Sequence, residues 1–140
     1  MSDYIRKAFS GYASYSARGQ FAFMLHRIAG LATLAFLTLH IATTATVFFM
    51  PQWYDKLVEL FRNPVIMAAE ILIAYFVVYH GVNGLRIAYL DLFRPDLWTK
   101  QASRKATPAV FMIAFILWLP ALAIMGYQLL KYGFGLFGGG

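Results

Sequence analysis

Three long apolar stretches dominate this chain of 140 residues. They run from about Phe21 to Met50, from about Pro64 to Leu92 and from about Pro108 to Leu130. Each exceeds the roughly 20 apolar residues that a helix needs to cross the hydrocarbon core of a bilayer. We therefore predict an all-α membrane protein with a three-helix transmembrane anchor domain over residues 21–131, the helices covering about 21–50, 64–92 and 108–130.

Composition narrows the chemistry available to this domain. Apolar residues make up 61% of the chain and charged residues 13%, about half the usual share of a soluble domain. The absence of cysteine excludes disulfides, thiolate metal sites and ligation of iron–sulfur clusters by this chain. A redox centre held here would depend on histidine. The net charge of +6 could suggest nucleic acid, but the basic residues cluster beside the membrane segments.

The distribution of basic residues predicts the orientation. Nine belong to the N-terminal arm, the beginning of the first span, the end of the second span or the loop after it: Arg6, Lys7, Arg18, Arg27, Arg86, Arg94, Lys100, Arg104 and Lys105. The first loop and the tail hold three: Lys56, Arg62 and Lys131. By the positive-inside rule, the N-terminus and the second loop are cytoplasmic.

The segments outside the spans are short. Residues 1–20 mix charged and aromatic side chains without an apolar signal-peptide core, so we expect no cleavable signal peptide. We interpret 1–20 as a cytoplasmic interfacial arm that lies at the membrane surface or docks on a soluble partner. Residues 52–63 and 93–107 are expected to be loops, and residues 132–140 a short external tail. The expected location is a bacterial or archaeal plasma membrane.

Two histidines, His40 and His80, lie inside the first and second spans. An intramembrane histidine costs free energy unless it has a partner, and haem iron is a suitable one. At about 1.5 Å per residue, His40 lies roughly 14 Å and His80 roughly 24 Å from the outer surface. The axial nitrogens of a bis-histidine haem are only about 4 Å apart. This offset favours two stacked haems, each taking one ligand from this chain and one from another subunit, over one haem shared by both residues.

The surroundings of the two histidines have a simpler interpretation as well. On helical spacing, His40 shares a face with Gly30, and His80 shares one with Gly84. Glycines there would let a flat macrocycle or a neighbouring helix come close, but such stripes are also ordinary helix-packing faces. Glu70 is the one carboxylate well inside a span, and it is interpreted either as part of a proton route or outer cofactor contact, or as a hydrogen-bond partner of another subunit.

Two motifs resemble a known family. Residues 26–30, His-Arg-Ile-Ala-Gly, are similar to the His-Arg-x-(Ser/Thr)-Gly signature of the cytochrome b membrane-anchor subunit of succinate dehydrogenase. His80-x-x-x-Gly84-x-Arg86-x-x-x-x-Asp91 resembles the second signature of that family, which contains an axial haem ligand. The three-helix pattern and the chain length agree, so the resemblance covers nearly the whole chain.

The resemblance implies a haem b-binding anchor in respiratory complex II, an enzyme of the tricarboxylic acid cycle. In such a complex, FAD and Fe–S clusters belong to a flavoprotein subunit and an iron–sulfur subunit, and electrons pass to a membrane quinone (menaquinone or ubiquinone) at the anchors. No substrate chemistry is expected in this chain, which would be an electron-transfer subunit of a succinate:quinone oxidoreductase.

The resemblance also implies roles for single residues. His80 would be an axial ligand of the inner haem, and His40 would match the ligand of the outer haem in the two-haem branch. His26 and Arg86 would meet haem propionates beside Gly84. Arg27 would lie at the quinone pocket, with Asp91 as its ion-pair partner.

The chain departs from the family pattern in two places. Many one-haem members have a serine that helps to hold the quinone three residues before the His-Arg pair, where this chain has Phe23. Phe23 could pack on a quinone ring but cannot donate a hydrogen bond. The hydroxyl position after Arg27 is Ala29. The details of the quinone pocket therefore stay open.

Three other readings compete with a haem-binding anchor. A fumarate reductase anchor differs only in the direction of electron flow. A haem-free structural tether of a respiratory complex would keep the helices without the iron. In a small transporter or assembly factor, the two intramembrane histidines would have no role in binding a cofactor. An absorption spectrum of the reduced protein separates the haem-binding readings from the others.

Overall fold

The computed structural model describes residues 2–97 and 100–136, with the side chains of residues 21–97 and 106–136. Three segments are long and apolar enough to cross a membrane. They are Phe21–Phe49 within α1 (Ser2–Phe49), all of α3 (Pro64–Phe93), and Ala106–Gly133, which joins α4 (Lys100–Gln128) to the π-helical turn η2 (Leu129–Gly133). No strand occurs in the described part of the chain. The predicted all-α protein with three membrane-spanning helices is confirmed.

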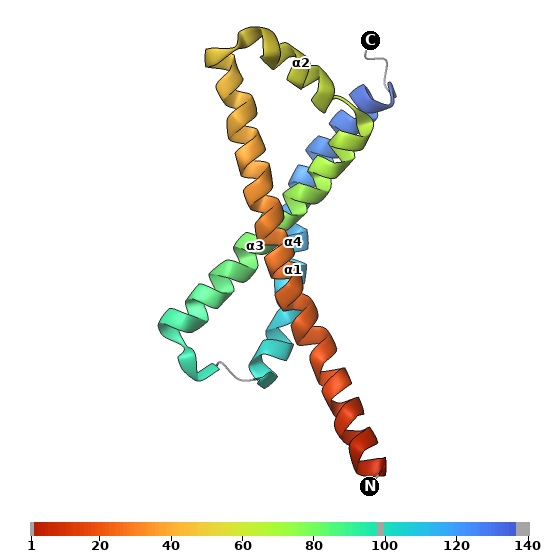
Figure 1. Cartoon of the computed structure of the whole chain (residues 1–140), viewed down its shortest axis with the longest axis vertical. Helices are drawn as coiled ribbons and strands as arrows, with labels where there is room; N and C mark the ends of the chain where they lie inside the picture. Colours follow the sequence, from red (N-terminus) through yellow and green to blue (C-terminus); the bar gives the residue numbers. More distant parts are fainter. Residues whose placement is uncertain (1, 98–99, 137–140) are drawn as a thin grey trace.

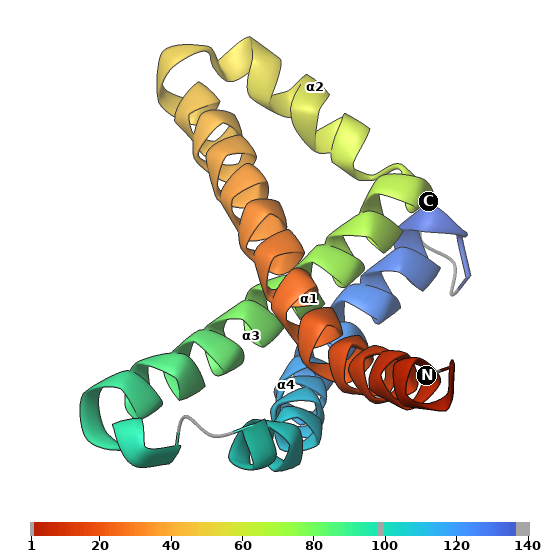
Figure 2. The same cartoon turned by 60° about the horizontal axis from the view of Figure 1, so that its bottom comes forward.

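The three long helices cross near one point and diverge on both sides of it (Figure 1). The first half of α3 lies beside the second half of α4 in both views (Figures 1 and 2). A hydrogen bond links these two helices: the indole N–H of Trp118 in α4 donates to the carbonyl of Ile71 in α3, at 3.0 Å. α1 crosses α3 at a steep angle, so the part of α1 that leads to Phe49 leaves the other two helices (Figure 1).

The buried core is confined to the crossing. Its buried apolar side chains come from all three helices: Ala29, Tyr79, Val110 and Ala114. Small residues on α1 and α4 let the backbones approach, as is typical of helix packing in membranes. Away from the crossing the apolar side chains are exposed, and Phe48 reaches 84%. These surfaces suit lipid or other membrane helices, because none of the residues that the structure describes covers them.

The N-terminal arm is helical. The predicted first span begins at residue 21, whereas α1 begins at Ser2 and runs without a break to Phe49. The side chains of residues 1–20 lie outside the described part, so the position of the arm at the membrane surface stays a prediction. The side chains of Lys100, Arg104 and Lys105 and residues 137–140 of the expected tail also lie outside the described part. What the sequence predicts for them stays a prediction.

The first connection is a helix, and the expectation of a loop over 52–63 was wrong. α2 (Pro51–Phe61) begins with a proline at its first position, where the missing N–H costs nothing. Its polar residues recur at helical spacing, a pattern hidden by the strongly apolar neighbours. Asn63 then caps α3, its side-chain oxygen accepting from the backbone N–H of Val65 at 2.9 Å.

The second connection is short and locally bonded. α3 ends at Phe93 because Arg94 precedes a proline and leaves the helical conformation. Pro95–Leu97 forms the 3-10 turn η1. The Arg94 guanidinium donates to both carboxylate oxygens of Asp96 at 3.0 and 2.9 Å, and these hydrogen bonds hold the pKa of that exposed carboxyl below its usual range.

The third span differs from its prediction at the start. Pro108 was expected near the beginning of the helix, but α4 begins at Lys100 and includes both Pro108 and Pro120. Prolines inside membrane helices are tolerated where neighbouring groups satisfy the freed carbonyl. The span ends in η2, and Gly135, at φ 65°, lets Leu136 N–H bond back to the carbonyl of Leu130 at 3.0 Å.

Candidate functional site

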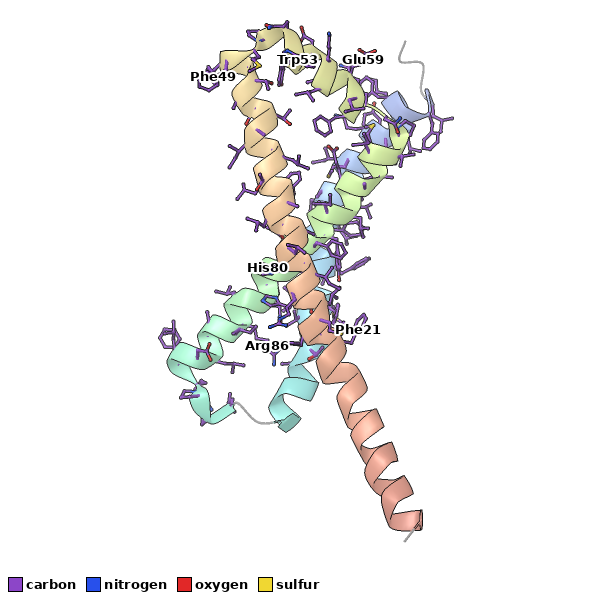
Figure 3. The ribbon with its side chains drawn as sticks, viewed as in Figure 1. Phe21, Phe49, Trp53, Glu59, His80 and Arg86 are labelled. Atoms are coloured by element: carbon purple, nitrogen blue, oxygen red, sulfur yellow. The ribbon has the colours of Figure 1, made fainter. Side chains whose placement is uncertain are left out.

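His80 lies at the helix crossing, where α3 passes α1 (Figure 3). Its ring rests against Gly30 so closely that a Cβ on that glycine would stand 2.8 Å from His80 Cε1. Only a residue without a side chain fits there. The sequence predicted that Gly30 would admit a close neighbour, and the structure shows that the neighbour is an imidazole.

The hydrogen bond of His80 determines which nitrogen is left for a ligand. Its Nδ1 lies 3.3 Å from the backbone carbonyl oxygen of His26. Because a carbonyl can only accept, Nδ1 carries the proton in this contact, and the neutral ring keeps its lone pair on Nε2. Bonding of one ring nitrogen to a backbone carbonyl is the usual support for a histidine that binds a metal through the other.

His26 packs directly on His80. The two rings are stacked, with centroids 4.4 Å apart and an angle of 10° between their planes. Gly84, one turn beyond His80, leaves room for this ring, and its added Cβ would lie 3.9 Å from His26 Cε1. His26 Nδ1 is buried and has no hydrogen-bond partner among the described residues. A buried polar atom in that state suits an acceptor that comes from outside the chain.

Arg86 belongs to the same region of α3. It is half-buried and lies just beyond His80 on the way to the end of α3 (Figure 3). A guanidinium at this depth presents several donors in a planar fork that suits a carboxylate. The predicted grouping of His26, His80, Gly84 and Arg86 is therefore brought together at one crossing.

Two residues of this region were not predicted from the sequence to belong to the site. Tyr79 is fully buried, donates to the carbonyl of Ala22 at 3.2 Å and stacks on Phe111 of α4 with centroids 4.9 Å apart. Asn83 is 6% exposed, one turn further along α3. A tyrosine and an asparagine four residues apart in an apolar span were the available signal, because polar groups there must find partners inside the bundle.

His40 has different surroundings. It is exposed on the part of α1 that has left the crossing, and its described ring contact is with Phe36 of the same helix, at 5.6 Å between centroids. The structure does not bring His40 to His80. Nor do the described residues contain a cluster of three or more histidine, cysteine or acidic side chains that could hold a bare metal ion.

The predicted quinone residues are only partly assembled by this chain. The Arg27 guanidinium carbon lies over the ring of Phe23, 4.6 Å from its centroid, and both side chains are exposed. Asp91 is exposed near the end of α3, which diverges from α1 beyond the crossing (Figure 1). The Arg27–Asp91 ion pair is not among the described contacts and stays a prediction. Glu70 is half-buried on α3, and its role stays a prediction too.

Comparison with known proteins gives two matches. Residues 6–121 match the family model of the succinate dehydrogenase/fumarate reductase transmembrane subunit. The chain is also similar to the succinate dehydrogenase 2 membrane subunit SdhC of Mycobacterium tuberculosis, with 23% identity over 114 residues. That alignment covers 81% of this chain and 82% of the mycobacterial protein.

Proposed function

Because the chain belongs to the family of succinate dehydrogenase/fumarate reductase transmembrane subunits, we propose that this membrane anchor binds haem b and contributes to a quinone site. The observation that carries the proposal is the His80 imidazole, wedged against Gly30 with Nδ1 bonded and Nε2 left with its lone pair. In a membrane interior this arrangement suits an axial ligand to iron better than a simple packing contact.

The residues around His80 supply the remaining requirements of such a site. His26 offers a buried Nδ1 without a partner among the described residues, and Arg86 offers a guanidinium. Both suit the propionates of a haem held by His80, with Gly84 leaving room beside them. A b-type haem bound there would accept and release single electrons.

To hold a second haem, His40 would need an opposite ligand from another subunit. Among the described residues no other helix packs against it, so a second small anchor subunit would supply the opposite ligand and cover this part of α1. The unequal depths of His40 and His80 support two haems per complex, one for each histidine. The partners would then be this second anchor, the iron–sulfur subunit and the flavoprotein subunit, which hold the Fe–S clusters and FAD.

The quinone site would include Arg27, Phe23 and Asp91. Phe23 can pack on a quinone ring while the Arg27 guanidinium, which lies over it, faces a carbonyl oxygen. Asp91 would pair with Arg27 in the assembled complex. The N-terminus and the second loop would lie in the cytoplasm of a bacterial or archaeal cell, so the quinone would be reached from that side of the plasma membrane.

Arg27→Ala tests the quinone role. We expect this variant to lose quinone reduction while it keeps succinate oxidation by a soluble artificial acceptor, because the flavoprotein and Fe–S chemistry lie outside this chain. Arg94→Ala, an exposed arginine on the connection after α3, is the matched control and should leave both activities unchanged. An equal loss in both assays for Arg27→Ala would indicate defective assembly and remove the quinone role.

The alternatives are a haem-free tether and a fumarate reductase anchor. The reduced-minus-oxidised absorption spectrum of the intact complex decides between haem and no haem. A b-type spectrum is expected, and a flat spectrum would leave the tether. Comparing the rates of succinate oxidation and fumarate reduction in the same complex gives the direction.

A further inference from the structure

The segment from α2 to the start of α3, together with η2, forms a corner of the molecule that the haem and quinone sites do not use. We call residues 51–63 and 129–133 the α2 corner. All three spans end at this level, because α2 joins the end of α1 to the beginning of α3 and η2 packs beside the beginning of α3 (Figure 1). Gly133 lies so close to Pro64 that an added Cβ would stand 3.2 Å from its Cβ.

α2 is amphipathic. At 100° per residue its polar side chains occupy one arc, and they are Gln52, Asp55, Lys56 and Glu59. Trp53, Leu57 and Leu60 point to the other side of the helix. A helix of this kind at the ends of membrane spans lies in the plane of the interface, with its apolar side toward the acyl chains. Its polar arc therefore faces the level of the lipid headgroups.

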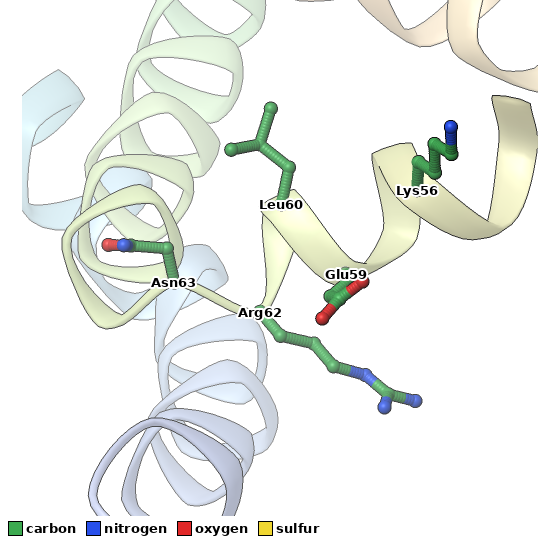
Figure 4. A pocket seen from close by; sticks show the side chains of 5 residues that line it. All are labelled: Lys56, Glu59, Leu60, Arg62 and Asn63. Carbon is green, nitrogen blue, oxygen red and sulfur yellow. The ribbon is translucent and has the colours of Figure 1, made fainter.

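A hollow of about 500 Å³ opens beside this polar arc. It is lined by Lys56, Glu59, Leu60, Arg62 and Asn63 (Figure 4). The N-terminus of α3, which follows Asn63, adds a positive partial charge on the same side.

Two cations converge on one aromatic ring at the edge of this hollow. The Arg62 guanidinium carbon lies 5.8 Å from the centroid of Tyr132, and Lys131 Nζ lies 5.1 Å from it. Neither cation forms an ion pair with a described carboxylate, whereas Arg94 does pair with Asp96 on the connection after α3. Two cations beside one ring, neither paired with a described carboxylate, leave local positive charge that an anion would offset.

We propose that Arg62 and Lys131 bind the phosphate of an anionic phospholipid, with Tyr132 beneath it and the lipid chains along the apolar side of α2. Both cations lie within 5.8 Å of the centroid of one ring, and their height at the span ends is that of a headgroup. Glu59 opposes an anion in the hollow, so the phosphate is expected on the Tyr132 side of Arg62. With the predicted orientation, this lipid belongs to the outer leaflet.

The test uses the intact complex, purified and reconstituted in nanodiscs of phosphatidylcholine with phosphatidylglycerol, and counts retained lipid by native mass spectrometry. Each cation near an anionic membrane surface contributes about a fivefold preference, so the double variant Arg62→Gln/Lys131→Gln should retain phosphatidylglycerol about thirtyfold more weakly. Arg94→Gln removes the same type of charge elsewhere and should leave retention unchanged. Glu59→Gln should strengthen retention about fivefold, which a variant that merely failed to fold would not do.

Several outcomes would overturn the proposal. Equal retention by the wild type and the double variant would mean that another surface holds the lipid. Loss of the lipid on adding inorganic phosphate at millimolar concentration would assign the cations to the free anion. Weaker retention after Glu59→Gln would remove the electrostatic basis. The readout depends on neither haem nor quinone, so its failure is distinguishable from failure of the proposed function.

Discussion

His80 and His40 are the same residue type on successive membrane spans, but the chain surrounds them differently. His80 lies where α1, α3 and α4 cross, with its ring against Gly30, stacked on His26 and bonded to a backbone carbonyl. His40 is exposed on the part of α1 that has left the crossing, and its described ring contact is with Phe36 of the same helix.

This difference shows how much of a cofactor site one small chain can build. At the crossing, contacts from two helices hold the His80 ring in place, and its bond to the His26 carbonyl favours the tautomer that would leave Nε2 for iron. On the free part of α1, the proposed ligand His40 would need surroundings supplied by another subunit. We expect the first histidine to depend on residues of this chain and the second to depend on the assembled complex.

The largest expected effect comes from removing either histidine. His80→Ala should remove the inner haem and keep the outer one, and His40→Ala should do the reverse, because in the proposed sites each ring would ligate a different iron. The haem content and the potentiometric titration of the purified complex measure this. Loss of both haems in either variant, with assembly intact, would contradict two separate sites.

The second-largest effect is expected from Gly30→Ala, which tests whether the helix crossing fixes the position of the His80 ring. The new Cβ would stand 2.8 Å from His80 Cε1, so the imidazole must move and its bond to the His26 carbonyl must weaken. We expect a severalfold loss of inner haem, with the outer haem retained. Gly81→Ala is the matched control, because an added Cβ there meets nothing within 4 Å. Full inner haem occupancy in Gly30→Ala would show that the close fit is not required.

The sequence could predict the spans and the grouping around His80, but not the paths of the helices. Spans follow from apolar length alone, and the residues on one helical face of α3 follow from spacing. The crossing does not, because nearly every face of α1 and α3 is apolar and no stripe marks the packed side. For the same reason, Gly30 was recognised as a place of close approach without its neighbour being known.

Short patterns of polar residues also predicted little about the structure. The polar arc of α2 covers only three turns, and two long apolar spans flank it, so the sequence predicted a loop there. Tyr79 and Asn83 are polar residues in an apolar helix, but aromatic and amide side chains also occur at the ends of spans. Their burial depends on α4 arriving beside α3, which no local pattern of α3 reveals.

Tyr79→Phe measures the contribution of one hydrogen bond at the crossing. It removes the bond to the Ala22 carbonyl and should lower the stability of the complex by about 1 kcal/mol. Thr38→Val is the control on the free part of α1, because the Thr38 hydroxyl bonds only to the Leu34 carbonyl of its own helix. We expect almost no change there. Thermal unfolding of both variants gives the comparison, and equal destabilisation would mean that the crossing is no more cooperative than the free helix.

The smallest expected effect concerns the Arg94–Asp96 pair, which lies beyond the crossing on the connection after α3. The hydrogen bonds from Arg94 lower the pKa of Asp96, so their stabilising effect is present above the ordinary aspartate pKa of about 4 and is lost as the pH falls through the lower folded value. Arg94→Gln should return the pKa of Asp96 toward its ordinary range, which NMR titration of the carboxyl carbon measures. Since this pair is exposed and touches neither His80 nor Gly30, the inner haem spectrum should not change. A shifted spectrum in Arg94→Gln would mean that the connection and the crossing are coupled, and that His80 is not held by the crossing alone.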